Sequence, residues 1–529
     1  MPSSPFSRLL PAVFTAAMLL ALPRGAWAAG WDAVEADKTI AFGFAAIVER
    51  HLQPVTAASI ALDGMRALAE IDPQLAVIVQ GGVVRISTAD SLVGEYPAPA
   101  AADSAGWARV TVAAITAARL SSEMIRAADD EALYQAVFEG ALGKVDLYSR
   151  YASAKEAREH RASRNGFGGI GIKFDMIESE PRIIEVIEDT PAARGGLKTG
   201  DVILMIDGQS VRPLDRNGIS ALLRGAVASD VLLLVRRGGD PVQVTLRRSL
   251  IVPKTVTMSL VGGIAEFKIA SFNQRTAYSL ESLLKDAKTR LGPGLTGVIL
   301  DLRGNPGGLL DKAVSVVDLF VDKGPIVSTK GRHPEADNAF DAHPGDMGED
   351  LPVVVLVDGR SASAAEIVAS ALQDAGRAVV VGTNSYGKGT VQTVIGLPND
   401  GEITLTWSRF HTPSGYALHG LGVLPVLCTG ANPNAAAVID GLLRGTQSAK
   451  LPETLAVWRQ SGFDETALRI RLRDTCPPAR RSEAKADLEL AEKLLLNRAA
   501  FARALALSTP PRTLEARQSR PPDYDAGQH

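Results

Sequence analysis

Cysteine is scarce in this chain: there are two among 529 residues, Cys428 and Cys476. In an oxidising compartment we favour one intramolecular disulfide between them, which would tie the C-terminal segment to the core; two separate buried thiols stay an alternative. None of the seven histidines lies in a ligand-like cluster with either cysteine. A zinc site is therefore not expected, and no metal centre is predicted.

The chain also lacks an apolar run long enough to cross a bilayer as a helix. The run Leu9–Leu22 is interrupted by Pro11 and is too short. Arg8 before it and the small-x-small site Ala26–Ala28 after it predict a secretory signal peptide over residues 1–28. The mature chain is expected to be exported, to the periplasm if the cell is Gram-negative, with no stable membrane span.

An excess of positive charge is missing as well. The 56 lysines and arginines face 59 acidic residues, and the formal net charge is −3. Removal of the predicted signal peptide would take away two arginines and no acid. Nucleic acid is therefore not expected as a partner.

The length and the 46% of apolar residues allow several domains. Helical periodicity dominates from Trp31 to about Arg161 and again over residues 430–508. The expected N-terminal helices are Ile40–His51, Val110–Ala127 and Glu131–Leu142. One interruption, Ala76–Ser87, predicts a hairpin around Gly81–Gly82. The proline-rich, polar end from Ser508 to His529 predicts a disordered tail.

A serine in a run of small residues is the first catalytic candidate. The continuous apolar run Val353–Val357 predicts a buried strand, and the helical spacing that follows places Ser363 near a helix N-terminus. Unpaired backbone N–H groups there suit an oxyanion hole, with the Ala364 N–H as one donor. The same Ser-x-x-Glu pattern is also a capping box, which taken alone would favour a helix cap.

A lysine between two glycines is the second candidate. Lys388 follows the apolar run Ala378–Val381, and the first carboxylate on its C-terminal side is Asp400. This is the local sequence of a desolvated amine, whose lowered pKa would let it act as a general base. Gln392, four residues later, could hold that amine in place without charging it.

A phosphate-binding loop is a competing interpretation of this stretch. Residues Gly382–Lys388 follow a strand-like run and fit such a loop up to the lysine. The next residue must then carry a hydroxyl and open a helix, but it is Gly389. The β-branched run Thr390–Ile395 predicts a strand instead, so nucleotide binding is not favoured.

Together the two stretches resemble the active-site region of the carboxyl-terminal processing proteases, the S41 family of serine peptidases. The family pattern S-A-S-A-x-E-I stands at Ser361–Ile367, and G-K-G-T-V-Q stands at Gly387–Gln392. The resemblance implies that Ser363 is the nucleophile, that Lys388 is the general base and that Gln392 orients the lysine.

A third motif supports the resemblance. The family's D-L-R-x-N-P-G-G stands at Asp301–Gly308, and it implies that the N–H of Gly307 or of Gly308 is the second oxyanion donor; the choice stays open. Strands alternate with helices from Thr255 to Leu427, which agrees with the crotonase/ClpP-like α/β core of the family. The polar segment 333–350 predicts a surface loop.

Residues 164–249 resemble a PDZ domain over its full length. The glycine-rich start Phe167–Ile172 exposes consecutive N–H groups that can form a nest for a peptide carboxylate, and the adjacent strand edge can pair with the peptide. A glycine-rich hairpin without a binding role stays an alternative. The nest residues are expected to be Gly168, Gly169, Ile170 and Gly171.

These patterns predict an exported serine endopeptidase that binds the C-terminal tails of protein or peptide substrates through its PDZ domain and cleaves them with a Ser/Lys dyad, without a cofactor. One alternative is a catalytically silent PDZ adaptor on a protease-like core. Another is a Ser/His/Asp site that uses His411 or His419. The resemblance further implies a homo-oligomer, and it brings a helical-repeat adaptor into consideration as a partner.

The expected architecture is an α/β protease core with an inserted PDZ domain and flanking helical regions. Its boundaries are a signal peptide at 1–28, an N-terminal mainly helical region at 29–162, the PDZ domain at 163–250, the protease core at 251–430, a C-terminal helical region at 431–508 and a tail at 509–529.

Overall fold

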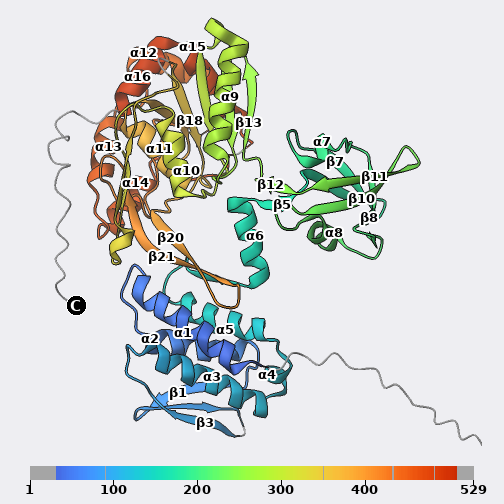
Figure 1. Ribbon diagram of the computed structural model, residues 1–529. Helices are drawn as coiled ribbons and strands as arrows, with labels where there is room; N and C mark the ends of the chain where they lie inside the picture. Colours follow the sequence, from blue (N-terminus) through green and yellow to red (C-terminus); the bar gives the residue numbers. More distant parts are fainter. Residues whose placement is uncertain (1–30, 90, 349–350, 432–433, 482, 509–529) are drawn as a thin grey trace, which may run out of the picture.

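The computed structural model describes residues 31–89, 91–348, 351–431, 434–481 and 483–508. Both the predicted signal peptide, 1–28, and the predicted tail, 509–529, lie outside these residues. Figure 1 shows an N-terminal helical region in blue at one end, a green PDZ unit at the side and an α/β core that runs from yellow to red. Among the described residues, no helix combines the length and apolar character that crossing a bilayer requires.

The N-terminal region packs helices against a small antiparallel sheet. Its elements are α1 (Ala33–Arg50), α2 (Ala57–Ala67), η1 (Leu68–Glu70), β1 (Ala76–Gln80), β2 (Val83–Ser87), β3 (Leu92–Pro97), α3 (Ser104–Ser121), α4 (Glu123–Ala127) and α5 (Asp130–Gly143). The predicted hairpin is confirmed by β1 and β2. The single helix predicted over Val110–Ala127 is wrong, because Ser122 interrupts it: its Oγ accepts the Ile125 N–H at 3.1 Å and caps α4.

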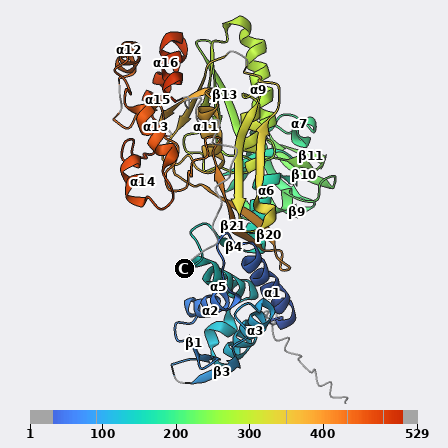
Figure 2. The ribbon, with the colours of Figure 1, turned by 90° about the vertical axis from the view of Figure 1, so that its left-hand side faces the viewer.

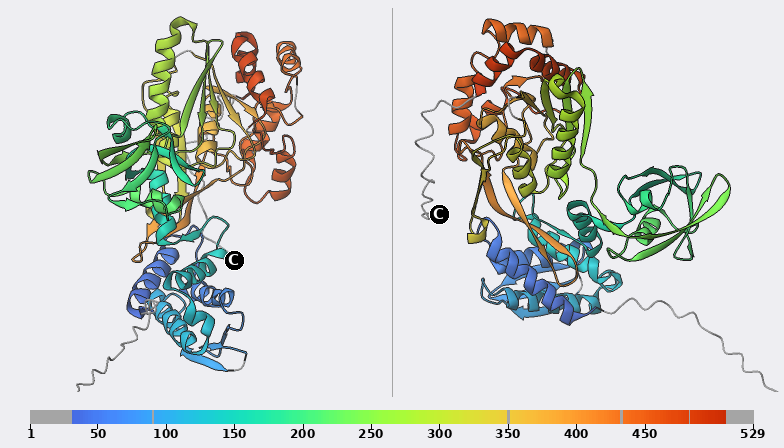
Figure 3. Two further views of the ribbon diagram at one scale, coloured as in Figure 1. Left: turned by 90° about the vertical axis from the view of Figure 1, so that its right-hand side faces the viewer. Right: turned by 45° about the horizontal axis from the view of Figure 1, so that its top comes forward.

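The PDZ unit follows α6 (Ala154–Asn165) and has an apolar core of its own. Its elements are β5 (Phe167–Gly169), β6 (Ile172–Ile177), β7 (Glu180–Val186), α7 (Pro191–Arg194), β8 (Val202–Ile206), β9 (Gln209–Ser210), α8 (Arg216–Leu223), β10 (Asp230–Arg237), β11 (Asp240–Arg247) and β12 (Ser249–Ile251). The main sheet has the order β11-β10-β8-β7-β6, so β6 is an edge strand. Figure 3 shows the unit set apart from the core.

The core is built on a mostly parallel sheet with the order β13-β14-β15-β18-β19-β22. Its strands are β13 (Val256–Val261), β14 (Ile264–Ile269), β15 (Gly297–Asp301), β18 (Val353–Val357), β19 (Ala378–Gly382) and β22 (Leu427–Cys428). Every residue of β18 is buried, as the apolar run predicted. Val353, Val355 and Val357 pack on one face, and Val354 and Leu356 on the other, because side chains alternate along a strand.

Helices cover both faces of this sheet (Figure 2). One face carries α9 (Thr276–Leu291) with η2 (Gly292–Gly294), α10 (Leu310–Asp318) and α11 (Ala364–Asp374). The C-terminal helices are α12 (Ala435–Arg444), α13 (Leu451–Gln460), α14 (Thr466–Arg473), α15 (Lys485–Leu496) and α16 (Arg498–Ser508). Of these, α12, α15 and α16 pack on the other face. This layering agrees with the predicted α/β protease core.

A second, antiparallel sheet joins the core to the N-terminal region. It contains β16 (Gly324–Gly331), β17 (Asn338–Ala342), β20 (Thr390–Gly396), β21 (Glu402–His411) and β4 (Arg150–Ala152), which pairs with β21. Ile395, Leu397, Ile403 and Leu405 at the tip of the β20–β21 hairpin belong to the N-terminal core. The surface loop predicted over 333–350 is wrong in part, because it contains η3 (Pro334–Ala336) and β17.

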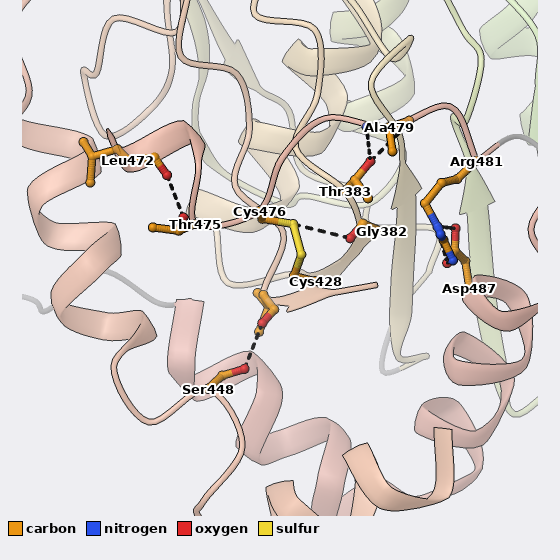
Figure 4. Close-up of a disulfide and its surroundings, with 11 residues drawn as sticks. Gly382, Thr383, Cys428, Ser448, Leu472, Thr475, Cys476, Ala479, Arg481 and Asp487 are labelled. Atoms are coloured by element: carbon orange, nitrogen blue, oxygen red, sulfur yellow. Dashed lines mark hydrogen bonds and ion pairs between the residues drawn. A yellow bond between two sulfur atoms is a disulfide. The ribbon is translucent and has the colours of Figure 1, made fainter. Parts of the chain in front are cut away.

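Cys428 at the end of β22 and Cys476 after α14 form a disulfide, shown in Figure 4, with Cα atoms 5.9 Å apart. The bond joins the parallel sheet to the segment between α14 and α15.

Candidate active site

Ser363 lies at the turn between β18 and α11. Its backbone has φ +55° and ψ −117°, a conformation that side-chain-bearing residues rarely adopt and that stores strain. Two other capping serines do not share it, because Ser122 and Ser153 have φ −111° and −55°. A serine on a strained strand–turn–helix junction is typical of nucleophiles that are presented to a substrate.

Glu366, in the first turn of α11, links this turn to the lysine loop. Its side chain is 0% exposed. The carboxylate accepts the backbone N–H groups of Ser363 at 2.7 Å, Gly387 at 2.7 Å and Lys388 at 2.9 Å, and Ser385 Oγ donates a fourth hydrogen bond at 2.5 Å. Burial raises the pKa of Glu366, and these hydrogen bonds offset only part of that rise. The carboxylate fixes the two predicted catalytic segments against each other.

Lys388 lies between β19 and β20 and is half-buried. Burial and the nearby Arg150 lower its pKa, while Glu366 and Asp146 oppose this shift. The Lys388 Nζ lies 4.9 Å from the centroid of the Tyr148 ring. An amine whose pKa lies below its usual range is neutral for more of the time near neutral pH, which a general base requires.

Gln392 lies in β20, four residues after Lys388. Its Nε2 donates to Thr390 Oγ1 at 3.0 Å and to Thr406 Oγ1 at 3.2 Å. Thr406 Oγ1 in turn donates to Asp146 Oδ1 at 3.0 Å. In the described part of the chain no hydrogen bond joins Gln392 to Lys388, so the orienting role of Gln392 stays a prediction.

The structure brings Ser363 and Lys388 together through their backbones, which share the Glu366 carboxylate. No hydrogen bond between the two side chains is found within the described residues. Catalytic hydrogen bonds are often long in a substrate-free enzyme and tighten only when substrate binds. The dyad therefore stays a prediction, and it is taken up below.

The glycine loop after β15 packs directly on the Ser363 turn. A Cβ built on Gly307 would lie 2.9 Å from Ser363 Cβ and 3.1 Å from Ala364 N. The Gly307 N–H donates to Asn305 Oδ1 at 2.8 Å. By contrast, the N–H groups of Gly308 and Ala364 donate to no acceptor among the described residues. These two groups are available to an incoming oxyanion.

The glycine-rich start of the PDZ unit, Gly168–Gly171, precedes the edge strand β6. A Cβ on Gly168 would lie 2.1 Å from Gly225 O, and one on Gly171, whose φ is +86°, would lie 2.3 Å from Thr190 Cβ. Glycine is therefore required for close backbone approach at these two positions. The edge of β6 can accept a peptide as an added strand, which is the usual PDZ binding mode.

Two other interpretations of this region are a phosphate-binding loop and a Ser/His/Asp site. Residue Gly389 is followed directly by β20, so the helix that a phosphate-binding loop requires is replaced by a strand. Burial lowers the pKa of His411 and of His419. His419 packs on Gly389 and contacts the Tyr148 ring edge-on, with ring centroids 6.2 Å apart. Neither histidine forms a hydrogen bond with Ser363 in the described part of the chain.

Sequence reasoning missed the bridging role of Glu366 and the contact of Tyr148 with the lysine. A usable signal existed for Glu366, because an acidic residue in an otherwise apolar helix requires buried partners. Tyr148 lies in the stretch Asp146–Tyr151, which resembles a signature of the family, but nothing in that stretch shows a contact with Lys388, 240 residues later. Among the described residues, no group of three or more His, Cys, Asp or Glu side chains could hold a metal ion.

Comparison with known proteins places these features in a family. The model of peptidase family S41 matches residues 263–427, and that of the PDZ domain matches residues 168–247. The carboxy-terminal-processing protease of Bartonella bacilliformis is 39% identical over 311 residues, which cover 58% of this chain and 72% of the relative. The processing protease CtpA of Bacillus subtilis is 31% identical over 311 residues, which cover 58% and 66%.

Among solved structures, the photosystem II D1 C-terminal processing protease matches with a TM-score of 0.35 and 22% identity, over 70% of this chain and 92% of that one. The family matches define a serine-type peptidase that carries a PDZ domain. The chain belongs to peptidase family S41, the carboxy-terminal-processing proteases.

Proposed function

We propose that this peptidase is an exported endopeptidase in which Ser363 is the nucleophile and Lys388 the general base. The supporting observation is the Glu366 carboxylate, which binds the backbone N–H of both residues. The two residues lie far apart in the sequence, and this buried bridge supports the proposal that they form one site.

Substrate binding begins at the PDZ unit. The carboxylate of a substrate tail binds the N–H groups of Gly168–Gly171, and the preceding residues pair with the edge of β6. This contact raises the local concentration of the tail at the core. The substrate class is therefore proteins or peptides with an accessible carboxyl terminus.

In the chemical step neutral Lys388 takes the proton of the Ser363 hydroxyl, whose oxygen attacks the peptide carbonyl carbon. The N–H groups of Ala364 and Gly308 donate to the oxyanion. We assign this role to Gly308 and not to Gly307, because the Gly307 N–H is already bonded to Asn305. The Lys388 ammonium then protonates the leaving amine, and the C–N bond breaks.

Hydrolysis of the acyl-enzyme repeats the proton transfers with water. Lys388 takes a proton from water, the hydroxide attacks the ester carbon, and the C–O bond to Ser363 breaks as the lysine returns the proton. Gln392, held by Thr390 and Thr406, is the residue that we expect to orient the lysine between these transfers.

The wider organisation is part of the proposal. Export through residues 1–28 to a periplasmic location, self-association through the helical regions, and the domain boundaries given above are predictions. The same holds for a helical-repeat adaptor as an activating partner.

Cleavage of a model protein with an apolar C-terminal tail tests the proposed function. We expect wild-type protein to cut it, and Ser363→Ala and Lys388→Ala to leave it intact while circular dichroism shows that both are folded. Removal of the substrate's tail is expected to raise KM more than it lowers kcat. A folded wild type that binds the tail and never cuts it would favour the PDZ adaptor.

A further inference from the structure

The last residues of α14 and the segment that follows them cross the end of the parallel sheet that carries the proposed active site. We call residues 469–481 the C-terminal strap. It lies beyond residues 263–427, the part that matches the peptidase family model. Its contacts show that it meets the turns that follow β18 and β19, which lead to Ser363 and Lys388.

Hydrogen bonds from both turns to the strap backbone fasten the strap in place. The Gly359 N–H donates to Ala479 O at 2.8 Å, and the Arg481 N–H donates to Asp358 Oδ2 at 2.8 Å. Thr383 Oγ1 donates to Ala479 O and accepts the Ala479 N–H, both at 3.2 Å (Figure 4). The strap thus spans the starts of the nucleophile turn and of the lysine loop.

Arg473, the last residue of α14, holds the lysine loop itself. Its guanidinium donates to Ser385 O at 3.0 Å, to Tyr386 O at 2.8 Å and to Leu421 O at 2.8 Å. A Cβ built on Gly387 would lie 3.0 Å from Arg473 Nη1. The planar guanidinium therefore binds three carbonyls at once and closes over the residue before Lys388.

The disulfide anchors this arginine. Cys476 follows Arg473 by three residues, is 1% exposed and is bonded to Cys428, which pairs with Gly382 at the end of β19. The covalent bond therefore ties the segment after α14 to β22, the strand that pairs with β19, from which the lysine loop starts (Figure 4).

We propose that Arg473 is a positioning residue for Lys388 and that the Cys428–Cys476 disulfide holds Arg473 in place. The inference rests on the proposed role of Lys388 as general base. Without these three hydrogen bonds the loop loosens, water reaches the amine, and the amine leaves the position from which it takes the Ser363 proton.

Loosening the loop also changes the titration of the base. The ionisable groups around Lys388 are Glu366 on α11, Tyr386 in its own loop, His419 after β21, and the set on the segment before α6: Asp146, Tyr148 and Arg150. Burial is the main cause of its lowered pKa. Entry of water reverses that shift, so the pH at which the base becomes neutral moves upward.

The rate of fluorophosphonate labelling of Ser363, measured from pH 6 to pH 10, tests the proposal without knowledge of the natural substrate. For Arg473→Met we expect labelling slower by about 100-fold at neutral pH, the usual scale for a displaced catalytic group, and a midpoint at higher pH. Arg473→Lys should be intermediate, because an ammonium cannot bind three carbonyls in one plane. The exposed Arg471 of the same helix supplies the control, Arg471→Met, which should match the wild type.

The disulfide is tested by replacing both cysteines with alanine. We expect labelling slower by about 10-fold, with a midpoint shifted as in Arg473→Met. Equal labelling rates and equal midpoints in folded Arg473→Met and wild type would overturn the inference alone. A folded wild type that is not labelled at all would overturn the proposed dyad, and the inference with it.

Discussion

Two helices in this chain begin with the same pattern, and only one of them lies at the proposed active site. Ser153-Ala-Lys-Glu156 starts α6, and Ser363-Ala-Ala-Glu366 starts α11. At α6 the backbone is extended, the Ser153 Oγ accepts the Glu156 N–H at 3.3 Å and the glutamate is exposed. This is an ordinary capping box.

At α11 the glutamate keeps one half of the capping box, because its carboxylate accepts the Ser363 N–H, and it also binds a distant loop. Ser363 has positive φ, and Glu366 is fully buried with hydrogen bonds to the lysine loop. The same short motif therefore allows either role, and burial and contacts with distant residues determine which role its side chains have.

Replacement of the serines is expected to give the largest difference between the starts of α6 and α11. Ser363→Ala is expected to lower peptidase activity by at least about 10⁴-fold, because it removes the nucleophile. Ser153→Ala should leave kcat unchanged and lower the free energy of unfolding by about 1 kcal/mol, through loss of a cap. Peptide cleavage and urea unfolding of the two variants measure both effects. Equal activities in the two variants would remove the distinction.

The glutamates give the next largest contrast. Glu366→Gln replaces one carboxylate oxygen by an N–H₂ group, which would face two of the four donors that the carboxylate now accepts. We expect kcat to fall by about 100-fold as the lysine loop moves, and the free energy of unfolding to fall by about 3 kcal/mol. The matched control is Glu156→Gln, which should change stability by less than about 1 kcal/mol. A Glu366→Gln variant with wild-type kcat would show that the bridge is not needed.

The pH dependence of stability distinguishes a buried lysine from an exposed one. Because burial lowers the pKa of Lys388 below 10.5, the unfolded chain binds more protons on this residue over the window between the lowered pKa and 10.5. Its contribution to stability therefore rises with pH across that window. Lys388→Met should abolish this rise and raise stability at neutral pH while it abolishes activity, whereas Lys155→Met in the α6 box should not. Urea unfolding at pH 7 and pH 10 compares the three proteins.

Backbone strain gives the smallest effect. A glycine adopts φ +55° without cost, so Ser363→Gly should be more stable than Ser363→Ala by about 1 kcal/mol. At the Ser153 cap glycine is also the better replacement, but by a smaller amount of roughly 0.7 kcal/mol, because alanine costs about 1 kcal/mol there and glycine a few tenths. Thermal unfolding of the four variants tests this. A gain at Ser363 that is no larger than the gain at Ser153 would contradict strain at the nucleophile turn.

Much of the core could be predicted from local sequence, because neighbouring residues in the chain decide which segments must be buried. A continuous apolar run such as Val353–Val357 has to be buried on both faces. A parallel strand between two layers of helices meets this requirement. The strand β17 was missed because its five residues, NAFDA, contain one large apolar side chain and no regular alternation, and its position is fixed by pairing with β16. The helix break at Ser122 was missed because a cap inside an apolar stripe does not disturb the periodicity.

The site was predictable as residue types in motifs and not as contacts. Nothing near Lys388 in the sequence shows that Tyr148 lies over its amine or that Arg473 binds its loop. The proposal of Gly308 over Gly307 as an oxyanion donor also required coordinates, since it rests on the hydrogen bond between the Gly307 N–H and Asn305.

The most direct test of the central claim is to locate the fluorophosphonate adduct by peptide mass spectrometry. We predict one adduct, on the Ser363 oxygen, formed by wild-type protein and not by folded Lys388→Ala. An adduct on Ser361 or Ser385 instead, or equal labelling of Ser363 when Lys388 is replaced, would contradict it.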